Sequence, residues 1–265
     1  MNQKAHMPIR EFSRLTNIKR ENLRFYDQIG LLSPEARGEN NYRYYSRRQL
    51  NTAYLISDLR ELGVGLEEIK RYSSARTPAA MLTLFEAQDK HIRAEMERLR
   101  TMREIMRLRS EMAREALSHP EDALMLVDKE PEPIFLCPPL GEGVMGEEGG
   151  ILSYDYAAAH AINLSHPMGV TIAHGDFLAC NPAAVLQYFF RVRRNHNAWK
   201  PGGRYAVAYG RCDVWNSAQV YRRLAGFIDA QGLRPQGDAW EEVLLDEMSV
   251  LDPEQFCIRV DVRVE

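Results

Sequence analysis

The chain has 265 residues, a formal net charge of −3 and a hydrophobic content of 45%, so we expect one or two domains with a sizeable core. No apolar run approaches the roughly 18–20 residues of a membrane span, the N-terminus has no apolar signal region, and the four cysteines lack CxxC spacing. These features exclude a membrane-spanning protein and a disulfide-rich scaffold, and they predict a cytoplasmic protein with reduced thiols.

The charge is distributed unevenly along the chain. Residues 1–77 carry +5, whereas residues 119–265 carry −9. A basic N-terminal third suits a polyanionic partner and an acidic C-terminal half suits cations, although each is also compatible with a merely solvated surface. Charge alone therefore does not identify the partner of either part, and sequence motifs are needed.

A helix-turn-helix is predicted at the start of the chain. Ile9, Phe12 and Leu15 are spaced three apart, as on one face of a helix over residues 8–15. Thr16 and Asn17 form a tight polar turn, and a second helix is expected over residues 19–28. Two short helices joined in this way are typical of a helix-turn-helix.

The following segment is predicted to contain a wing and two more helices. A loop rich in Pro, Gly and Asn leads to residues 41–45, which complete a hairpin. Ser46 can cap the next helix, with Gln49 three residues later as in a capping box. Apolar residues continue at helical spacing to Leu62, and a short helix over residues 66–72 follows a break.

This N-terminal part resembles the MerR family of transcription regulators. The residues that carry the resemblance are Leu23-Arg24-Phe25-Tyr26-Asp27, Ile29-Gly30-Leu31-Leu32, Pro34, Asn41-Tyr42-Arg43-Tyr44-Tyr45, Leu59-Arg60-Glu61-Leu62-Gly63 and Leu66-Glu67-Glu68-Ile69. The resemblance implies a winged helix-turn-helix domain over residues 1–77 that binds double-stranded promoter DNA, with RNA polymerase as a further partner. The family has a Ser or Thr cap before its recognition helix, where this chain has Lys19.

The expected DNA contacts come from the turn, the recognition helix and the wing, because their side chains can bond phosphates or base edges. Arg24 and Tyr26 should face DNA, although a core position is the alternative for Tyr26 and for Phe25. Arg43 and Tyr44 should contact the DNA backbone from the wing. The full candidate set is Thr16, Asn17, Lys19, Arg20, Asn22, Arg24, Tyr26, Arg43, Tyr44 and Arg47.

Residues 78–118 are predicted to form one long helix. Apolar residues recur every seven positions, at Phe85, Ile92, Leu99, Met106 and Ala113. The companion column is half polar, which favours an antiparallel helix pair. The resemblance places an antiparallel coiled-coil dimerisation helix here, and a homodimer would read two half-sites. Metal- and redox-sensing members carry cysteines near the end of this helix, where this chain has none, so we expect no metal and no cofactor.

Residues 119–265 are predicted to form an α+β domain with an antiparallel sheet, which makes the whole chain a multidomain protein. Strands are expected over 123–127, 134–137, 170–173, 177–179, 186–193, 203–210, 240–245 and 256–264, and helices over 151–164 and 214–228. The last strand alternates between two sets of side chains. The segments Gly202–Ala206 and Trp240–Val243 resemble a GyrI-like effector-binding domain, so the whole chain resembles the BmrR-like multidrug-sensing type of the family.

The resemblance implies a site for lipophilic cations, which requires a carboxylate within an aromatic cup. In the BmrR-like pattern the carboxylate follows an aromatic residue in the penultimate strand, which here is Glu241 after Trp240. Glu242 should point to the other face, so one carboxylate should be buried and the other exposed; exposure of both is the alternative. The remaining candidates are Tyr154, Tyr156, Tyr209, Trp215, Glu254 and Phe256.

The sequence thus predicts a ligand-responsive regulator, an activator that distorts promoter DNA as a dimer and senses lipophilic cationic or hydrophobic drugs. One alternative is a regulator of the same build that senses an endogenous non-cationic ligand or a protein. Another is a GyrI-like hydrolase fused to a DNA-binding domain. No Ser/His/Asp or Cys/His arrangement has suggestive spacing, so we do not expect an enzyme.

Overall fold

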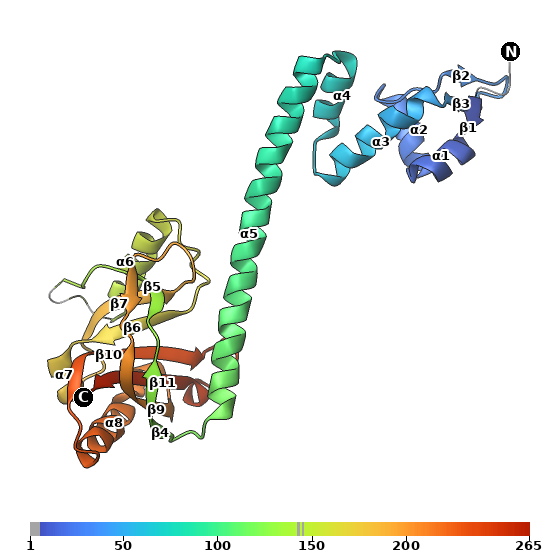
Figure 1. Ribbon diagram of the computed structural model, residues 1–265. Coiled ribbons are helices and arrows are strands. Elements are labelled where there is room, and N and C mark those ends of the chain that lie inside the picture. Colours follow the sequence, from blue (N-terminus) through green and yellow to red (C-terminus); the bar gives the residue numbers. More distant parts are fainter. Residues whose placement is uncertain (1–5, 142–143, 145) are drawn as a thin grey trace. The chain divides into compact units, whose positions relative to one another are not determined.

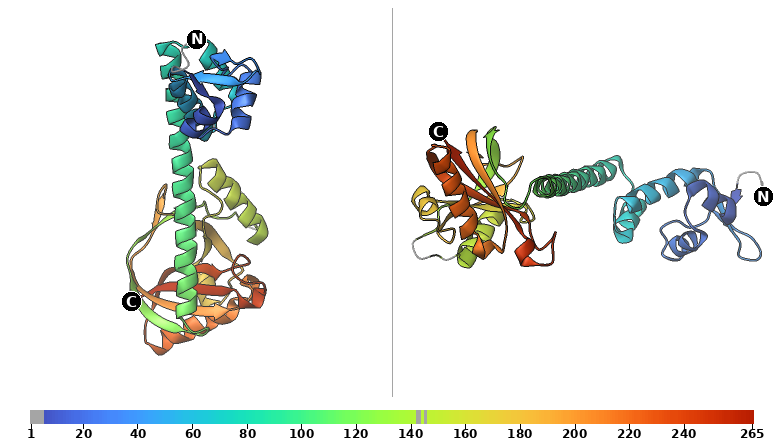
Figure 2. Two further views of the ribbon diagram at one scale, coloured as in Figure 1. Left: turned by 90° about the vertical axis from the view of Figure 1, so that its right-hand side faces the viewer. Right: turned by 90° about the horizontal axis from the view of Figure 1, so that it is seen from below.

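The computed structural model describes residues 6–141, 144 and 146–265. The chain divides into two compact units, Met1–Arg98 and Leu99–Glu265 (Figures 1 and 2). Helix α5 (Pro78–Ser118) is continuous through the division. Among the residues that the structure describes, no helix combines the length and apolarity needed to cross a membrane.

The first unit is a winged helix-turn-helix. Its elements are β1 (His6–Pro8), α1 (Ile9–Thr16), α2 (Arg20–Gln28), β2 (Ala36–Arg37), β3 (Arg43–Ser46), α3 (Arg48–Glu61), α4 (Leu66–Ser74) and the first part of α5. The strands form an antiparallel sheet in the order β1-β3-β2. Phe12 of α1 stacks on Tyr45 of β3 with ring centroids 4.3 Å apart, and this pair lies in the core between helices and wing.

Local signals in the sequence account for the turns of this unit. Asn17 ends α1 in the left-handed conformation, with φ of 57°, which asparagine tolerates better than most residues. Half of the predicted capping box is present: the backbone N–H of Ser46 donates to Oε1 of Gln49 at 3.0 Å. The hydroxyl of Ser46 does not complete it, because α3 begins two residues later, at Arg48. The short strand β1 was not predicted from the sequence.

The second unit is built on a twisted antiparallel sheet of eight strands in the order β4-β9-β11-β10-β6-β7-β5-β8. The strands are β4 (Leu124–Lys129), β5 (Glu132–Leu136), β6 (Met168–Ile172), β7 (Val185–Arg191), β8 (Ala198–Lys200), β9 (Gly203–Arg211), β10 (Pro235–Leu245) and β11 (Cys257–Val264). The helices are α6 (Gly146–Ala159), α7 (His174–Leu178) and α8 (Ala218–Ala230), with short 3-10 turns η2 (Val214–Asn216) and η3 (Pro253–Gln255). The predicted fold class is confirmed, including the antiparallel C-terminal sheet.

Helices cover both faces of this sheet, and strand alternation assigns each residue to one face. On β9, Ala206 and Ala208 pack with Leu224 of α8. The alternate residues Tyr205, Val207 and Tyr209 belong to the other face and pack in one cluster with Met112, near the end of α5. Figure 1 shows α8 and the end of α5 on opposite sides of the sheet. Both faces are therefore buried, which explains why both sets of residues on β11 are buried, with Arg263 the exposed exception.

Three predicted elements are wrong or displaced. The segment 177–179 is not a strand: Phe177 lies in α7, and its N–H donates to the carbonyl of Ala173 four residues earlier. A run of three apolar residues cannot distinguish a strand from a helical turn. The helix expected over 151–164 lies at Gly146–Ala159, and the one expected over 214–228 is split into η2 and α8.

Candidate functional site

The recognition helix α2 presents a polar, basic face. Arg20, Asn22 and Arg24 are exposed, whereas Leu23 is fully buried. Lys19 is the N-cap residue of α2, and its side chain makes no capping hydrogen bond, as expected for lysine. Exposed guanidinium and amide groups on such a helix suit contacts to phosphates and base edges.

Two residues of the predicted DNA-binding set do not have the expected orientation. Tyr26 is 7% exposed and belongs to the core, because it follows Leu23 by three positions and shares its face. Phe25, for which a core position was an open alternative, is 45% exposed. Thr16 is also buried, and its hydroxyl donates to the carbonyl of Phe12 at 2.8 Å, so its side chain closes the turn.

Asp27 connects the recognition helix to the wing. Its carboxylate accepts from Arg37 at 2.8 and 2.6 Å and from Nε of Arg43 at 2.7 Å. Burial opposes ionisation of this carboxyl, but the hydrogen bonds and charges of Arg43 and Arg37 outweigh it and lower its pKa. The wing arginine predicted to contact DNA is thus held in place from the recognition helix.

The remaining predicted residues of this face lie near the turn and the wing. Asn17 and Arg47 are exposed, and Arg43 and Tyr44 are half-buried. The ring of Tyr44 contacts that of Tyr42 at 5.4 Å between centroids. With Lys19, Arg20, Asn22 and Arg24, these residues remain the predicted DNA contacts of the chain.

The second unit contains a cavity of about 490 Å³ on the face of the sheet opposite α5. Its described lining is mostly aliphatic and comes from α6, β6, the segment before β7, β7, η2 and β10. The lining residues are Gly150, Ile151, Tyr154, Met168, Gly169, Val170, Pro182, Ala183, Val185, Tyr188, Val214, Glu241 and Val243. Among these described residues, Glu241 supplies the carboxyl group.

Glu241 is held at the cavity by two hydroxyl groups. Its Oε2 atom accepts from the hydroxyl of Tyr221 at 2.7 Å and from that of Ser217 at 3.2 Å. The side chain is buried, which raises its pKa to about 7, although both hydrogen bonds act in the opposite direction. Both donors are neutral, so the negative charge of the ionised form is not compensated by them.

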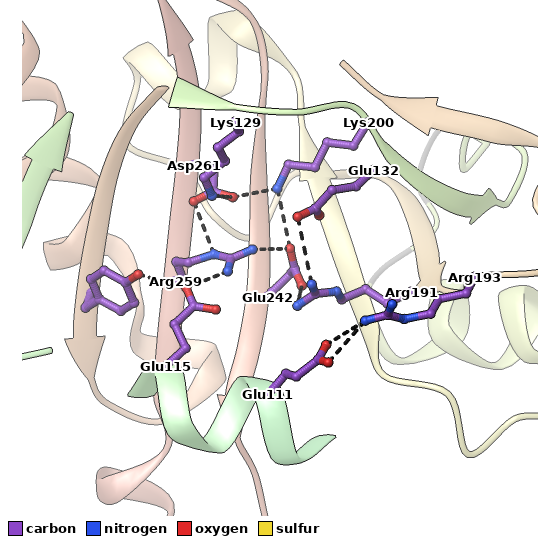
Figure 3. A network of polar contacts seen from close by, with 11 residues as sticks. Glu111, Glu115, Lys129, Glu132, Arg191, Arg193, Lys200, Glu242, Arg259 and Asp261 are labelled. Atoms are coloured by element: carbon purple, nitrogen blue, oxygen red, sulfur yellow. Dashed lines mark hydrogen bonds and ion pairs between the residues drawn. The ribbon is translucent and has the colours of Figure 1, made fainter. Parts of the chain in front are cut away.

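Glu242 departs from the prediction. One of the two neighbouring carboxylates was expected to be exposed, but Glu242 is 1% exposed, on the face covered by α5. There its Oε1 atom accepts from Arg259 at 2.5 Å, and Lys200 and Arg191 lie at 3.4 and 3.3 Å (Figure 3). Burial opposes its ionisation, but these cations lower its pKa to about 2.

Of the other predicted ligand residues, the structure places Tyr154 at the cavity. Tyr209 lies on the opposite face, where its hydroxyl donates to Glu115 at 2.8 Å. Tyr156 packs against Phe135 and His160. Glu254 and Phe256 lie in and just after η3 and do not belong to the described lining, and the side chain of Trp215 lies outside the described residues.

Tyr188 of β7 lines the cavity but was missed. The alternation of residues along the predicted strand 186–193 was the available signal, because it separates Tyr188 and Phe190 from Phe189. No group of three His, Cys, Asp or Glu side chains suited to a metal ion occurs within the described ranges.

Comparisons with known proteins find similarity both to the N-terminal part and to the whole chain. Residues 7–76 match the model of the MerR HTH family regulatory protein. The multidrug-efflux transporter 2 regulator of Bacillus subtilis (strain 168) is 28% identical, over 99% of this chain and 97% of that protein. The multidrug-efflux transporter 1 regulator of the same strain is 22% identical, over 99% of each.

Among solved structures, a cryo-EM structure of an EcmrR–DNA complex covers 98% of this chain and 99% of its own, with 14% identity and a TM-score of 0.41. Together, the residues, the fold of the N-terminal unit and the full-length relatives lead to one conclusion. Residues 7–76 form a MerR-type helix-turn-helix domain, and the chain is homologous over its full length to the multidrug-efflux transporter regulators of Bacillus subtilis.

Proposed function

We propose that this regulator is an activator whose C-terminal unit senses lipophilic cations. The observation that carries the proposal is the buried carboxyl of Glu241 at a largely aliphatic cavity of about 490 Å³. Drug-sized ligands occupy cavities of roughly 300–1,000 Å³ that are mostly apolar and contain a few polar groups. The names of the two full-length relatives, both regulators of multidrug-efflux transporters, support the same class of ligand.

The electrostatics of Glu241 favour a cation over a neutral ligand. An ionised carboxylate in an apolar site is strongly unfavourable unless a positive charge accompanies it. The described partners of Glu241 are two neutral hydroxyls, so a cationic ligand would supply the missing charge. The rings of Tyr154 and Tyr188 add aromatic surface, which attracts cations by about 0.5–2 kcal/mol each.

The proposal includes a homodimer formed through α5. Large apolar side chains on this helix are exposed in the single chain, among them Phe85 (44%), Leu99 (52%) and Met106 (62%). These three belong to the column that repeats every seven residues, which is the pattern of a helix that packs against a partner helix. A two-fold dimer would place two recognition helices on two half-sites of one promoter.

Activation requires that the ligand favours one state of the DNA-bound dimer. The resemblance to the family implies that the dimer distorts the promoter so that RNA polymerase can engage it. A ligand with equal affinity for two states shifts nothing, so the cation must bind the activating state more tightly. Promoter DNA, RNA polymerase and the small-molecule effector are therefore the proposed partners.

Isothermal titration calorimetry with tetraphenylphosphonium tests the proposal on the wild-type protein and two matched variants. Glu241→Gln removes the charge at the cavity, whereas Glu254→Gln removes a charge from the exposed 3-10 turn η3. We expect Glu241→Gln to weaken binding by about 10- to 100-fold, as for a lost charge-assisted interaction. Glu254→Gln should bind like wild type. Equal loss in both variants, or no binding by wild type, would contradict the proposal.

A further inference from the structure

A cluster of buried charges lies on the face of the sheet beside the end of α5 (Figure 3). The cavity lies on the other face. The centre of the cluster is Arg259 of β11, flanked by Glu242 of β10 and Asp261 of β11. The side chains of all three are at most 4% exposed. Lys200 adds a second buried cation, 2.5 Å from Asp261 and 3.4 Å from Glu242.

The cluster extends from the sheet to the end of α5. Nη1 of Arg259 donates to Oε1 of Glu115 at 2.6 Å, and Nη2 donates to Oε1 of Glu242 at 2.5 Å. Glu115 also accepts from the hydroxyl of Tyr209, whose ring stacks on His119 at 4.5 Å. One guanidinium therefore joins strand β10 to the last turns of α5.

Stability alone does not explain such a cluster. Desolvating several charges is so unfavourable that well-packed apolar residues are often equally or more stabilising in their place. Where buried ionic groups are kept, fixing one arrangement or choosing between two is the best-attested role. The position of this cluster indicates what it fixes, because Glu242 directly follows Glu241 in the chain.

Glu241 and Glu242 share one strand but face opposite sides of it. Glu241 accepts a hydrogen bond from Tyr221 on the cavity side, and Glu242 accepts one from Arg259 on the side of α5. A ligand that displaces the Glu241 side chain acts on the same stretch of backbone that carries Glu242. The strand has little free space beside it: a Cβ atom on Gly169 of β6 would lie 2.6 Å from the carbonyl oxygen of Glu241.

We propose that the series Glu242–Arg259–Glu115 transmits occupation of the cavity to the C-terminal turns of α5. The inference rests on the proposed function, since it assumes a ligand at Glu241. Charge-assisted bonds of 2.5 and 2.6 Å are short and directional, so a small shift of β10 must move Arg259 with it or break a bond. Packed cores convert such small shifts into a choice between discrete arrangements.

The charges of the series persist across the physiological pH range. The cations around Glu242 overcome its burial and lower its pKa to about 2, and the pKa of Arg259 is raised above its ordinary value because the neighbouring carboxylates outweigh desolvation. A change in this connection must therefore come from geometry rather than from titration of these two groups.

Hydrogen exchange of the full-length protein, read by mass spectrometry on peptides that cover residues 104–118, tests the proposal. Exchange is measured with and without saturating tetraphenylphosphonium in wild type, Glu115→Ala and Arg114→Ala. Glu115 is the partly exposed member of the series, with 26% of its side chain exposed, so its loss is tolerated better than that of Arg259. Arg114 is its exposed neighbour and serves as the matched control.

We expect the ligand to change exchange in this peptide on the order of tenfold in wild type and Arg114→Ala, within the usual range of coupling between sites. Glu115→Ala should bind the ligand with an unchanged dissociation constant and lose the change. A change that persists in Glu115→Ala overturns the proposal, as does its absence in wild type with ligand bound. If Glu115→Ala does not fold, Glu115→Gln replaces it and should reduce the change at least about threefold, because charge-assisted bonds are roughly twice as strong as neutral ones.

A ligand-independent comparison separates this inference from the proposed function. Glu241→Gln alters the hydrogen bonds on the cavity side without any ligand. It should change exchange of residues 104–118 in the wild-type background and not in the Glu115→Ala background. If tetraphenylphosphonium fails to bind but this difference is present, the choice of ligand is wrong and the connection stands. If Glu241→Gln has the same effect in both backgrounds, the connection is refuted.

Discussion

At the scale of single residues, two consecutive carboxyl groups have opposite electrostatics. The pKa of Glu241 is raised to about 7 by burial beside two neutral hydroxyls, while that of Glu242 is lowered to about 2 by three cations that overcome its burial. The two residues are consecutive in β10, and strand alternation places their side chains on opposite faces of the sheet. Among the described contacts, Glu241 thus has two neutral hydroxyl partners, whereas Glu242 belongs to an ion cluster.

This difference predicts a pH-dependent stability that depends on Glu241. Its folded pKa of about 7 lies above the ordinary 4.5, so the folded protein holds the proton more tightly than the unfolded chain. The resulting stabilisation is present below pH 4.5 and is lost as the pH rises through 7. Between pH 5 and pH 8 the free energy of unfolding should therefore lose roughly 2–3 kcal/mol from this group.

Urea unfolding at both pH values, without ligand, measures this contribution. Glu241→Gln should remove it and should be more stable than wild type at pH 8. Glu254→Gln, in the exposed turn η3, should keep the wild-type pH dependence. An identical pH dependence in wild type and Glu241→Gln would show that Glu241 is ionised throughout this range.

The sequence located Glu241 but not the environment of Glu242. The resemblance to the BmrR-like pattern, in which the carboxylate follows an aromatic residue, singled out Glu241, and strand alternation predicted that Glu242 points to the other face. The burial of Glu242 depends on Arg259 and Lys200, which follow from sheet pairing, and on α5, which covers that face. Such long-range pairing leaves no local signal in a single sequence.

At the scale of elements, Asp27 joins the recognition helix to the wing. The carboxylate of Asp27 binds Arg37 and Arg43, which lie on β2 and β3. The helix-turn-helix spacing and the wing hairpin were visible in the sequence. Tyr26 was predicted to face DNA and is buried instead, because one aromatic residue on a short amphipathic helix can belong to either face.

Asp27→Asn should loosen the wing. We expect a loss of about 1–2 kcal/mol in the free energy of unfolding of the first unit, since the two arginines are partly exposed and screened by solvent. Affinity for an operator selected from random DNA should also fall, because Arg43 is no longer held. Arg24→Ala is the contrasting variant. Arg24 is exposed, so the free energy of unfolding should be unchanged while operator affinity falls. The slope of log affinity against log salt concentration should become shallower by about one unit. Unchanged stability and DNA affinity in Asp27→Asn would refute this role of the carboxylate.

At the scale of the whole molecule, the proposed function depends on two copies joined through α5. The column of apolar residues on α5 was evident from the sequence, because a repeat of seven over a long helix is a strong signal. The sequence was less informative for the second unit, where short apolar runs are ambiguous. The segment around Phe177 was predicted as a strand and is helical.

Leu99→Glu should dissociate the proposed dimer. Leu99 is 52% exposed in the single chain, so the substitution leaves the fold of the monomer intact but places two charges in the helix pair. Losing two buried leucines should raise the dimer dissociation constant by at least about 100-fold. Sedimentation equilibrium measures this change. Lys90→Glu, exposed on the same helix and outside the apolar column, should remain dimeric; a Leu99→Glu protein that associates like wild type would exclude this surface from the interface.

The most direct test of the account is transcription in vitro, with bacterial RNA polymerase, from a promoter that the wild-type protein binds. Tetraphenylphosphonium should increase transcript from this promoter in the presence of wild-type protein. It should have no effect with Glu241→Gln, although that variant should still bind the promoter, since Glu241 lies in the second unit and the predicted DNA contacts lie in the first. An equal response with both proteins, or no response with wild-type protein shown to hold the ligand, would contradict the claim that a cation at Glu241 controls transcription.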